Sequence, residues 1–231
     1  MSPRYAVYFV PAAQSALYRF GSALLGYDCY TGKEIDFPAA LPLDPAAWRE
    51  VTREPRRYGF HATLKAPFHL AYGFDEAALF DAFHLLCGSM EGAAFTPVVA
   101  VVEGFIAIIP SGPEPTVDRL AADCVTAFDR FRAPLSEHDR ERRLAARLSE
   151  QQAQNLERWG YPYVFEDFRL HLTLTGRLSA ERQSHVLPFL REQFAMACSA
   201  AAVPIDAIAL LRQDDAQSRF RVLGRAWIAA E

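Results

Sequence analysis

The sequence is poor in cysteine: its four cysteines are scattered over 231 residues, and no two of them form a Cys-x-x-Cys pair. This spacing argues against a disulfide framework and indicates small buried side chains in a reducing compartment. No apolar run approaches the ~20 residues that a membrane-spanning helix needs. The first ten residues also lack the charged and apolar regions of a signal peptide. We therefore expect a cytoplasmic protein with no membrane segment.

Glycine-rich phosphate loops are missing as well, because neither a P-loop nor a dinucleotide-binding pattern occurs. The histidines, cysteines and carboxylates do not form a set of three or four close zinc ligands, so we expect neither a metal nor another cofactor. A net charge of −4 provides no overall basic field, which argues against a long nucleic acid as partner. A small phosphorylated substrate and a monomer or weak dimer are the expectation.

What the sequence does contain is a duplicated motif of the form His-x-Thr-Leu. The two copies lie in residues 58–68 and 167–177, and their members are His61, Thr63 and Leu64, then His171, Thr173 and Leu174. Apolar and polar residues alternate through both segments. Side chains on a strand point to opposite faces with a period of two, so each copy predicts a strand with one apolar face and one face that carries histidine and threonine.

The remaining pattern predicts two similar series of elements, which indicates a duplicated α+β protein. The first series is a strand at 5–10, a helix at 12–25, the first His strand, a helix at 75–90 and a strand at 95–102; the second is a strand at 105–109, a helix at 116–132, the second His strand, a helix at 179–198 and a strand at 204–212. We expect a single bilobal domain over 1–231, with antiparallel-sheet lobes near 1–103 and 104–231, outer helices and a central cleft. Strands can be exchanged between the lobes.

The paired motifs point to acid–base chemistry on a phosphate. Residues i and i+2 of a strand share a face about 6–7 Å apart, so His61 and Thr63 can reach one bound group, and His171 and Thr173 can do the same. One neutral imidazole can accept a proton while a charged one donates. The threonine hydroxyls can hold the non-bridging oxygens.

Four further residues are candidates for substrate binding. Lys65 and Arg177 fall on the polar faces of the motif strands and would supply positive charge, although strand-end charges are often only solvated. Tyr58 precedes the first motif, and its side chain lies either in the protein core or at the rim of the site. Tyr163, with its neighbour Tyr161, precedes the second motif and could stack on a base or a sugar.

The duplicated His-x-Thr-Leu resembles the signature of the 2H phosphoesterase superfamily. The two motif segments are similar to those of an uncharacterised bacterial branch of this superfamily, which is associated with phosphonate-utilisation operons. Their sequences are Tyr-Gly-Phe-His-Ala-Thr-Leu-Lys-Ala-Pro-Phe and, later in the chain, His-Leu-Thr-Leu-Thr-Gly-Arg. The resemblance implies a bilobal α+β fold of the RNA ligase-like kind, no metal, and cleavage or formation of a 2′-linked phosphodiester or cyclic phosphate. It also implies that His61 and His171 form the acid–base pair and that Thr63 and Thr173 hold the phosphate.

Several alternatives stay open at this level. The same fold could serve an RNA-end processing enzyme or a 2′,5′ ligase, or a non-catalytic module that binds a phosphometabolite. The sequence assigns neither histidine as acid or base. The charged segment 136–159 is typical of a solvated helix, or else it forms a lid or an arm that collects anions.

Overall fold

A computed structural model describes residues 2–144, 147–198 and 202–228, apart from the side chains of residues 138 and 142. It confirms the α+β class. The main sheet is antiparallel and has seven strands in the order β11-β10-β1-β4-β8-β7-β6. These strands are β1 (Arg4–Phe9), β4 (Ala62–Phe68), β6 (Pro97–Val102), β7 (Phe105–Pro110), β8 (Leu172–Thr173), β10 (Ala207–Gln213) and β11 (Arg221–Trp227).

Two short strand pairs, eight α-helices and two 3-10 helices (Asp129–Phe131 and Phe165–Asp167) complete the described fold. The pairs are β2 (Tyr27–Asp28) with β3 (Lys33–Glu34), and β5 (Ala93–Phe95) with β9 (Val203–Ile205). The helices are α1 (Ala16–Leu25), α2 (Pro45–Val51), α3 (Arg53–Arg56), α4 (Glu76–Cys87), α5 (Pro115–Phe128), α6 (Glu137–Leu144), α7 (Glu150–Trp159) and α8 (Ala180–Ala197). Among the described residues, none of the helices combines the length and the apolarity needed to cross a bilayer.

Local hydrogen bonds fix the starts of three helices. The side chains of Asp44, Asp75 and Ser179 accept hydrogen bonds from backbone N–H groups in the first turns of α2, α4 and α8. Such a cap satisfies N–H groups that have no partner inside the helix. Asp75 and Ser179 stand at the starts of the two helices that the sequence predicts over 75–90 and 179–198.

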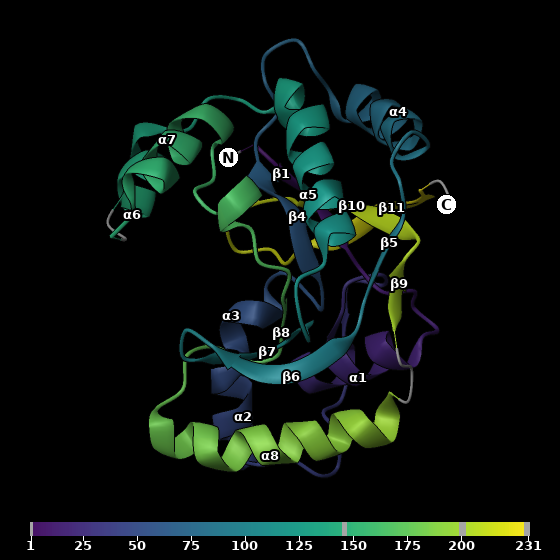
Figure 1. Ribbon diagram of the computed structural model, residues 1–231, viewed down its shortest axis with the longest axis vertical. Coiled ribbons are helices and arrows are strands. Elements are labelled where there is room, and N and C mark those ends of the chain that lie inside the picture. The colour runs from purple at the N-terminus through teal and green to yellow at the C-terminus, as the bar shows by residue number, and fades with distance from the viewer. Residues whose placement is uncertain (1, 145–146, 199–201, 229–231) are drawn as a thin grey trace.

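The helices form two groups on opposite sides of the molecule (Figure 1), with β4 and β8 between them. Helices α4 and α5 pack on β10, β11 and β4, whereas α8 packs on β6 and β7 with α1 beside it. Strands β10 and β11 come from the end of the chain and pair beside β1. Each half of the sheet therefore combines strands from both halves of the sequence.

Strand β1 shows how the sheet separates its two faces. Tyr5 points toward the outer helices, where its hydroxyl donates to Glu76 of α4 at 2.9 Å. Arg4 and Tyr8, of the opposite parity, line a cavity on the other face. At β1, a helix therefore covers one face of the sheet, and a cavity lies on the other face.

The structure corrects the lengths of several predicted elements. The second His strand is reduced to two residues, because the N–H groups of Leu174 and Thr175 both donate to Ile106 O, at 2.9 and 3.2 Å. The Thr175 hydroxyl in turn accepts from Ile106 N, so a side chain replaces the regular ladder. The charged segment is two helices rather than one, since Ser149 caps α7 with a capping box; residues 145–146 lie outside the described part.

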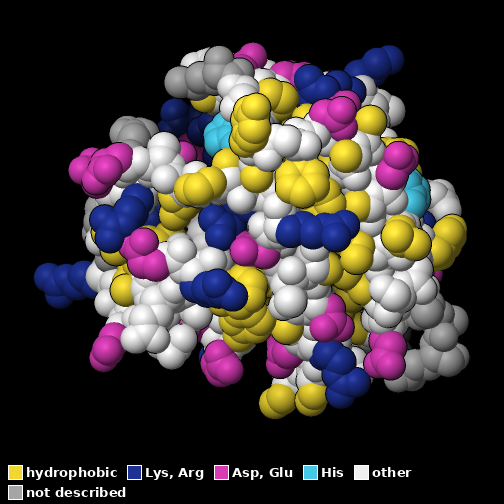
Figure 2. Space-filling view, turned by 90° about the horizontal axis from the view of Figure 1, so that it is seen from above, with side chains coloured by type: hydrophobic (Ala, Val, Ile, Leu, Met, Phe, Trp, Pro, Cys, Tyr) yellow, Lys and Arg dark blue, Asp and Glu magenta, His cyan; other side chains and the backbone are white. Residues whose placement is uncertain are grey.

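Seen from above, Lys and Arg side chains are interspersed with Asp and Glu (Figure 2), and no basic area dominates this face. The mixture agrees with the net charge of −4. A long polyanion would find alternating attraction and repulsion across this surface.

Candidate active site

The two motifs meet because β4 and β8 are neighbours in the sheet. These strands are antiparallel and pair Ala62 with Leu172. This register puts His61 opposite Thr173 and Thr63 opposite His171. Directly opposite residues of an antiparallel pair have Cβ atoms about 4.5–5.5 Å apart and share a face. Each histidine is therefore adjacent to both threonines, one on its own strand and one on the next.

The ring of His61 is fixed by two hydrogen bonds. Its Nδ1 lies 2.8 Å from the carbonyl oxygen of Gly59, and its Nε2 lies 3.3 Å from Oγ1 of Thr63. A carbonyl can only accept, so Nδ1 carries the proton of the neutral ring. Nε2 is then a lone-pair acceptor that faces the Thr63 hydroxyl. This tautomer is the one that a general base needs.

Tyr8 forms the floor beneath His61. The two rings stack with centroids 3.9 Å apart and an interplanar angle of 26°, and Tyr8 itself is fully buried. Burial lowers the pKa of His61 from 6.5 to about 4; the Gly59 carbonyl opposes this shift, and the charge of His171 adds to it. His61 is therefore neutral at pH 7.

Gly59 holds the carbonyl that orients His61, and its backbone requires glycine. Its φ is +78°, and an added Cβ would lie 2.6 Å from the Cβ of Cys29. Other residues rarely adopt this left-handed conformation. The turn before β4 thus positions the first imidazole.

The second histidine repeats the bonding of the first. Nδ1 of His171 lies 2.7 Å from the carbonyl oxygen of Arg169, again two residues earlier in the chain. Its ring is 5.6 Å from that of Phe105, without the close stacking that covers His61. The two imidazoles therefore present the same nitrogen, Nε2, but in different surroundings.

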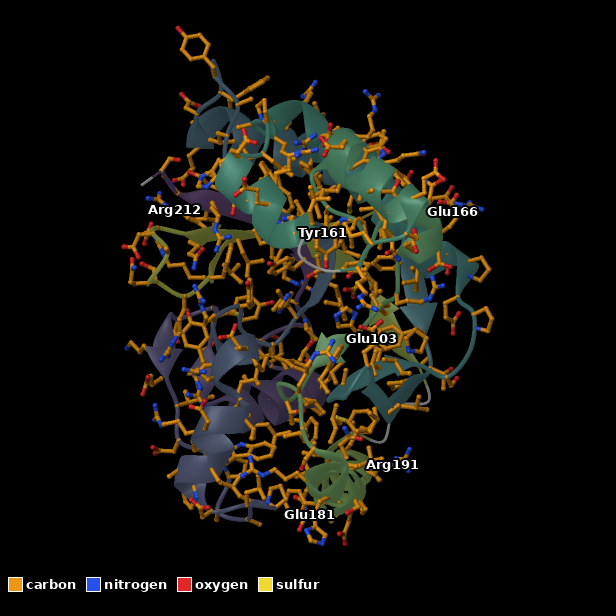
Figure 3. All side chains as sticks on the ribbon, turned by 90° about the vertical axis from the view of Figure 1, so that its left-hand side faces the viewer. Glu103, Tyr161, Glu166, Glu181, Arg191 and Arg212 are labelled. Carbon is orange, nitrogen blue, oxygen red and sulfur yellow. The ribbon has the colours of Figure 1, made fainter. Side chains whose placement is uncertain are left out.

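Beside the motifs lies a cavity of about 380 Å³. Its wall comes from β1, β4, β8, helix α6 and the loop after α7, through Arg4, Tyr8, Tyr58, His61, Thr63, Ala66, Pro67, Arg143, Tyr161 and Thr173. His171 lines a second hollow, of about 440 Å³. The two hollows share no lining residue, so His61, Thr63 and Thr173 line one cavity and His171 lines the other. Figure 3 shows Tyr161 near the middle of the molecule, above Glu103.

Lys65 does not reach this cavity, because a β-bulge turns it to the other face. Tyr8 pairs with Thr63 but Val7 pairs with Lys65, which leaves one extra residue on β4. The Lys65 ammonium is buried under α5, where it donates to Val125 O at 3.0 Å and to Asp129 at 2.8 Å. Burial lowers its pKa, and Asp129 opposes that effect.

The other substrate-binding candidates divide into two groups. Tyr58 lines the cavity, with its ring 5.9 Å from His61 and stacked on Phe220 at 5.4 Å. Arg177 lies outside it, exposed and bonded to the carbonyl oxygen of Glu103 at 2.6 Å. Tyr163 is 41% exposed and does not line this cavity; its ring contacts that of Tyr161 edge to face at 5.5 Å. Their roles in binding stay predictions.

Sequence reasoning did not select Arg4, Tyr8 or Arg143 for the site. The period of two on β1 gives Arg4 and Tyr8 a common face, but it does not indicate that β1 lies beside β4. Arg143 belongs to the charged segment for which an anion-collecting arm was one alternative. Its guanidinium lies 5.1 Å from the ring centre of Tyr161, so part of this segment does form the cavity wall.

Among the described residues, no group of three or more His, Cys, Asp or Glu side chains is arranged to hold a metal ion. Fold and site together define an α+β protein in which two His-Thr pairs face each other across neighbouring strands. The chain belongs to the family described as "Protein of unknown function (DUF1045)", whose model matches residues 63–221.

Two curated proteins resemble the chain, both named "Ribose 1,5-bisphosphate phosphokinase PhnN". One, from Janthinobacterium sp. (strain Marseille), is 35% identical over 91% of this chain and 48% of its own length. The other, from Laribacter hongkongensis (strain HLHK9), is 33% identical over 97% of this chain and 52% of its own. The chain thus spans about half the length of these relatives.

Two solved structures align with the chain at low similarity. "Crystal structure of phosphoesterase" covers 99% of both chains, with a TM-score of 0.43 and 13% identity. "Structure of Kluyveromyces marxianus Usb1" covers 95% of this chain and 98% of its own, with a TM-score of 0.35 and 13% identity. Similarity of this degree supports no argument about the reaction.

Proposed function

We propose that the protein is a metal-independent phosphoesterase of the 2H type, which hydrolyses a cyclic phosphodiester of a nucleotide or a sugar. The observation that carries the proposal is the pairing of the motifs: His61 and His171 immediately precede the neighbouring strands β4 and β8, and the register of Ala62 with Leu172 places them diagonal to each other, each opposite a threonine. Both rings are oriented by a carbonyl two residues earlier. Two imidazoles that both hold Nδ1 against a backbone carbonyl leave Nε2 for proton transfer, with Nε2 of His61 facing the Thr63 hydroxyl at 3.3 Å.

The environments of the two rings favour different roles. His61 is neutral at pH 7 because burial lowers its pKa to about 4, so we assign it as the general base. In this scheme Nε2 of His61 takes a proton from water, and the water oxygen bonds to phosphorus in line. The bond from phosphorus to the sugar oxygen breaks, and His171, protonated at Nε2, gives its proton to that oxygen.

The threonines stabilise the charge on phosphorus during this step. Thr63 and Thr173 lie on the same face as the two imidazoles, and their hydroxyls can donate to the non-bridging oxygens. Donors that are already in place cost no reorganisation when charge develops, which is the usual source of such stabilisation.

The names of the relatives support a ribose derivative within this class of substrates. Both are phosphokinases of ribose 1,5-bisphosphate, and the resemblance of the motif implies a role in phosphonate metabolism. Phosphate transfer from ATP is not proposed for this chain, since its sequence has no P-loop pattern. We propose cleavage of a ribosyl cyclic phosphate as the reaction to test first.

The test is a turnover screen in the presence of a chelator, with nucleoside 2′,3′-cyclic phosphates and ribosyl cyclic phosphates as substrates and phosphorus NMR as readout. We expect a phosphomonoester product with at least one substrate, and a loss of at least ~100-fold for His61→Ala or His171→Ala. His185→Ala, on the exposed side of α8, is the matched control. Wild-type rates from a folded His61→Ala variant would end the proposal.

Two other outcomes would indicate a different function for the protein. Binding of cyclic phosphates without turnover of any would indicate a non-catalytic module. Salt-sensitive RNA binding together with end processing or joining would indicate an enzyme that acts on RNA ends.

A further inference from the structure

The segment that carries His61 into the site lies just outside the sheet, because strand β4 begins only at Ala62. Two hydrogen bonds attach this segment to the loop between β10 and β11. The backbone N–H of Phe220 donates to the carbonyl oxygen of Arg57 at 2.8 Å, and the Arg57 guanidinium donates to the carbonyl oxygen of Ala216 at 2.7 Å. A loop from a distant part of the sequence therefore supports the approach to the first motif.

Phe220 also completes a closed group of four rings that includes the imidazole of His61. Tyr8 stacks on His61 with centroids 3.9 Å apart, and Tyr58 lies 5.9 Å from the same imidazole. The ring of Phe220 contacts both tyrosines: it is stacked on Tyr58 at 5.4 Å, with an interplanar angle of 15°, and tilted against Tyr8 at 6.1 Å. The two tyrosines that contact the imidazole thus share one support.

Phe220 is itself fixed on all sides. Its side chain is fully buried, and its carbonyl oxygen accepts a hydrogen bond from the Tyr27 hydroxyl at 2.8 Å. The Arg4 guanidinium lies over its ring, 5.6 Å from the centroid. Aromatic pairs at such separations attract each other beyond the effect of the buried area alone. Phe220 is therefore a rigid partner for the two tyrosines.

His61 needs this support because a single hydrogen bond does not fix the plane of a ring. The contact of Nδ1 with the Gly59 carbonyl, at 2.8 Å, restrains one edge of the imidazole. Rotation about that edge would move Nε2 away from the Thr63 hydroxyl, 3.3 Å away, and the face of Tyr8 opposes this rotation. A displacement of about 1 Å at a reacting group can lower a rate about 100-fold.

We propose that Phe220 is a positioning residue for His61, which acts through Tyr8 and Tyr58 to keep Nε2 in the place that the general base requires. This inference rests on the proposed function, and it makes the loop between β10 and β11 part of the support of the site. Phe220 itself contacts neither motif histidine nor the reacting atoms.

The charges around His61 stay the same when Phe220 is replaced by leucine. The ionisable groups near the imidazole are Tyr8 on β1, Tyr58 before β4, His171 before β8, and Arg4, Arg143 and Tyr161 on the cavity wall. Phe220→Leu alters none of them. A change in the pKa of His61 in this variant therefore reports a change in its hydration.

The test compares Phe220→Leu with the matched control Phe83→Leu. Phe83 is equally buried, on α4, and its ring contacts are His84 and Phe128. We expect the pKa of His61, followed by NMR and assigned with His61→Asn, to rise from about 4 toward 6.5 in Phe220→Leu alone, since water reaches the imidazole once the tyrosines lose their support. At pH 8, where His61 is neutral in every variant, kcat for a cyclic phosphate should fall at least about 10-fold in Phe220→Leu, with KM within about twofold.

The NMR result separates this inference from the proposed function. If the pKa of His61 rises only in Phe220→Leu but no cyclic phosphate turns over, the positioning role stands and the phosphodiesterase fails. If cyclic phosphates turn over and Phe220→Leu equals Phe83→Leu in both kcat and the pKa of His61, the positioning role is refuted. Phe220→Met, whose longer and more adaptable side chain fills more of the space, gives the same comparison should the leucine variant not fold.

Discussion

Replacing His61 with asparagine isolates the energetic consequence of burying an imidazole at this site. The side chain of asparagine is short and carries an amide that can still donate to the Gly59 carbonyl, as Nδ1 does at 2.8 Å. The variant removes the titrating group and Nε2 while it keeps a polar partner for that carbonyl. We therefore expect it to fold.

The magnitude follows from the pKa of His61, which is 6.5 in an unfolded chain and is lowered to about 4 in the fold. Because the unfolded state binds the proton more readily, the stability contributed by neutral His61 is fully present above pH 6.5 and declines as the pH falls toward 4. Between pH 8 and pH 5 the wild type should lose about 2 kcal/mol from this group. His61→Asn should lack that loss.

Urea denaturation at pH 8 and pH 5 measures the difference, with the slope m compared to ensure that the unfolding transition is unchanged. Contributions from all other titrating groups cancel when the two proteins are subtracted. His185→Asn, at an exposed position on α8, should behave as the wild type. An equal pH dependence in wild type and His61→Asn would refute the assignment of His61 as a desolvated, neutral base. Because His61 must be neutral to act as the general base, we also expect kcat/KM to rise as the pH increases through about 4.

Three further substitutions test other parts of the structure. Gly59→Ala should destabilise the fold by about 1–3 kcal/mol, since its φ of +78° and its contact with Cys29 exclude a side chain; an unchanged melting temperature would contradict this. Lys65→Met should cost about 3 kcal/mol in urea denaturation because a buried ion pair loses one partner, and a loss below about 1 kcal/mol would argue against the buried pair. Thr173→Val should lower kcat about 100-fold with little change in stability; an unaffected kcat would remove Thr173 from the mechanism.

The candidate pair His61 and His171 was accessible from the sequence because its signal is local. Alternation with a period of two places histidine and threonine on one face of each strand, and this holds wherever the strand lies in the sheet. Helix starts at Asp75 and Ser179 are local in the same sense, since a side chain bonds to the backbone three residues later.

Only the tertiary structure decided what surrounds these pairs. Strand order depends on long-range pairing, and no local pattern indicates that β4 lies between β1 and β8. The bulge that turns Lys65 away from the cavity arises from the register of β4 against β1. Arg4 and Arg143 are separated by most of the chain and meet only because β1 and α6 border one hollow. The alternation of residues thus determined the reactive groups by itself, whereas packing between distant segments determined the charge and the shape of the site that they share.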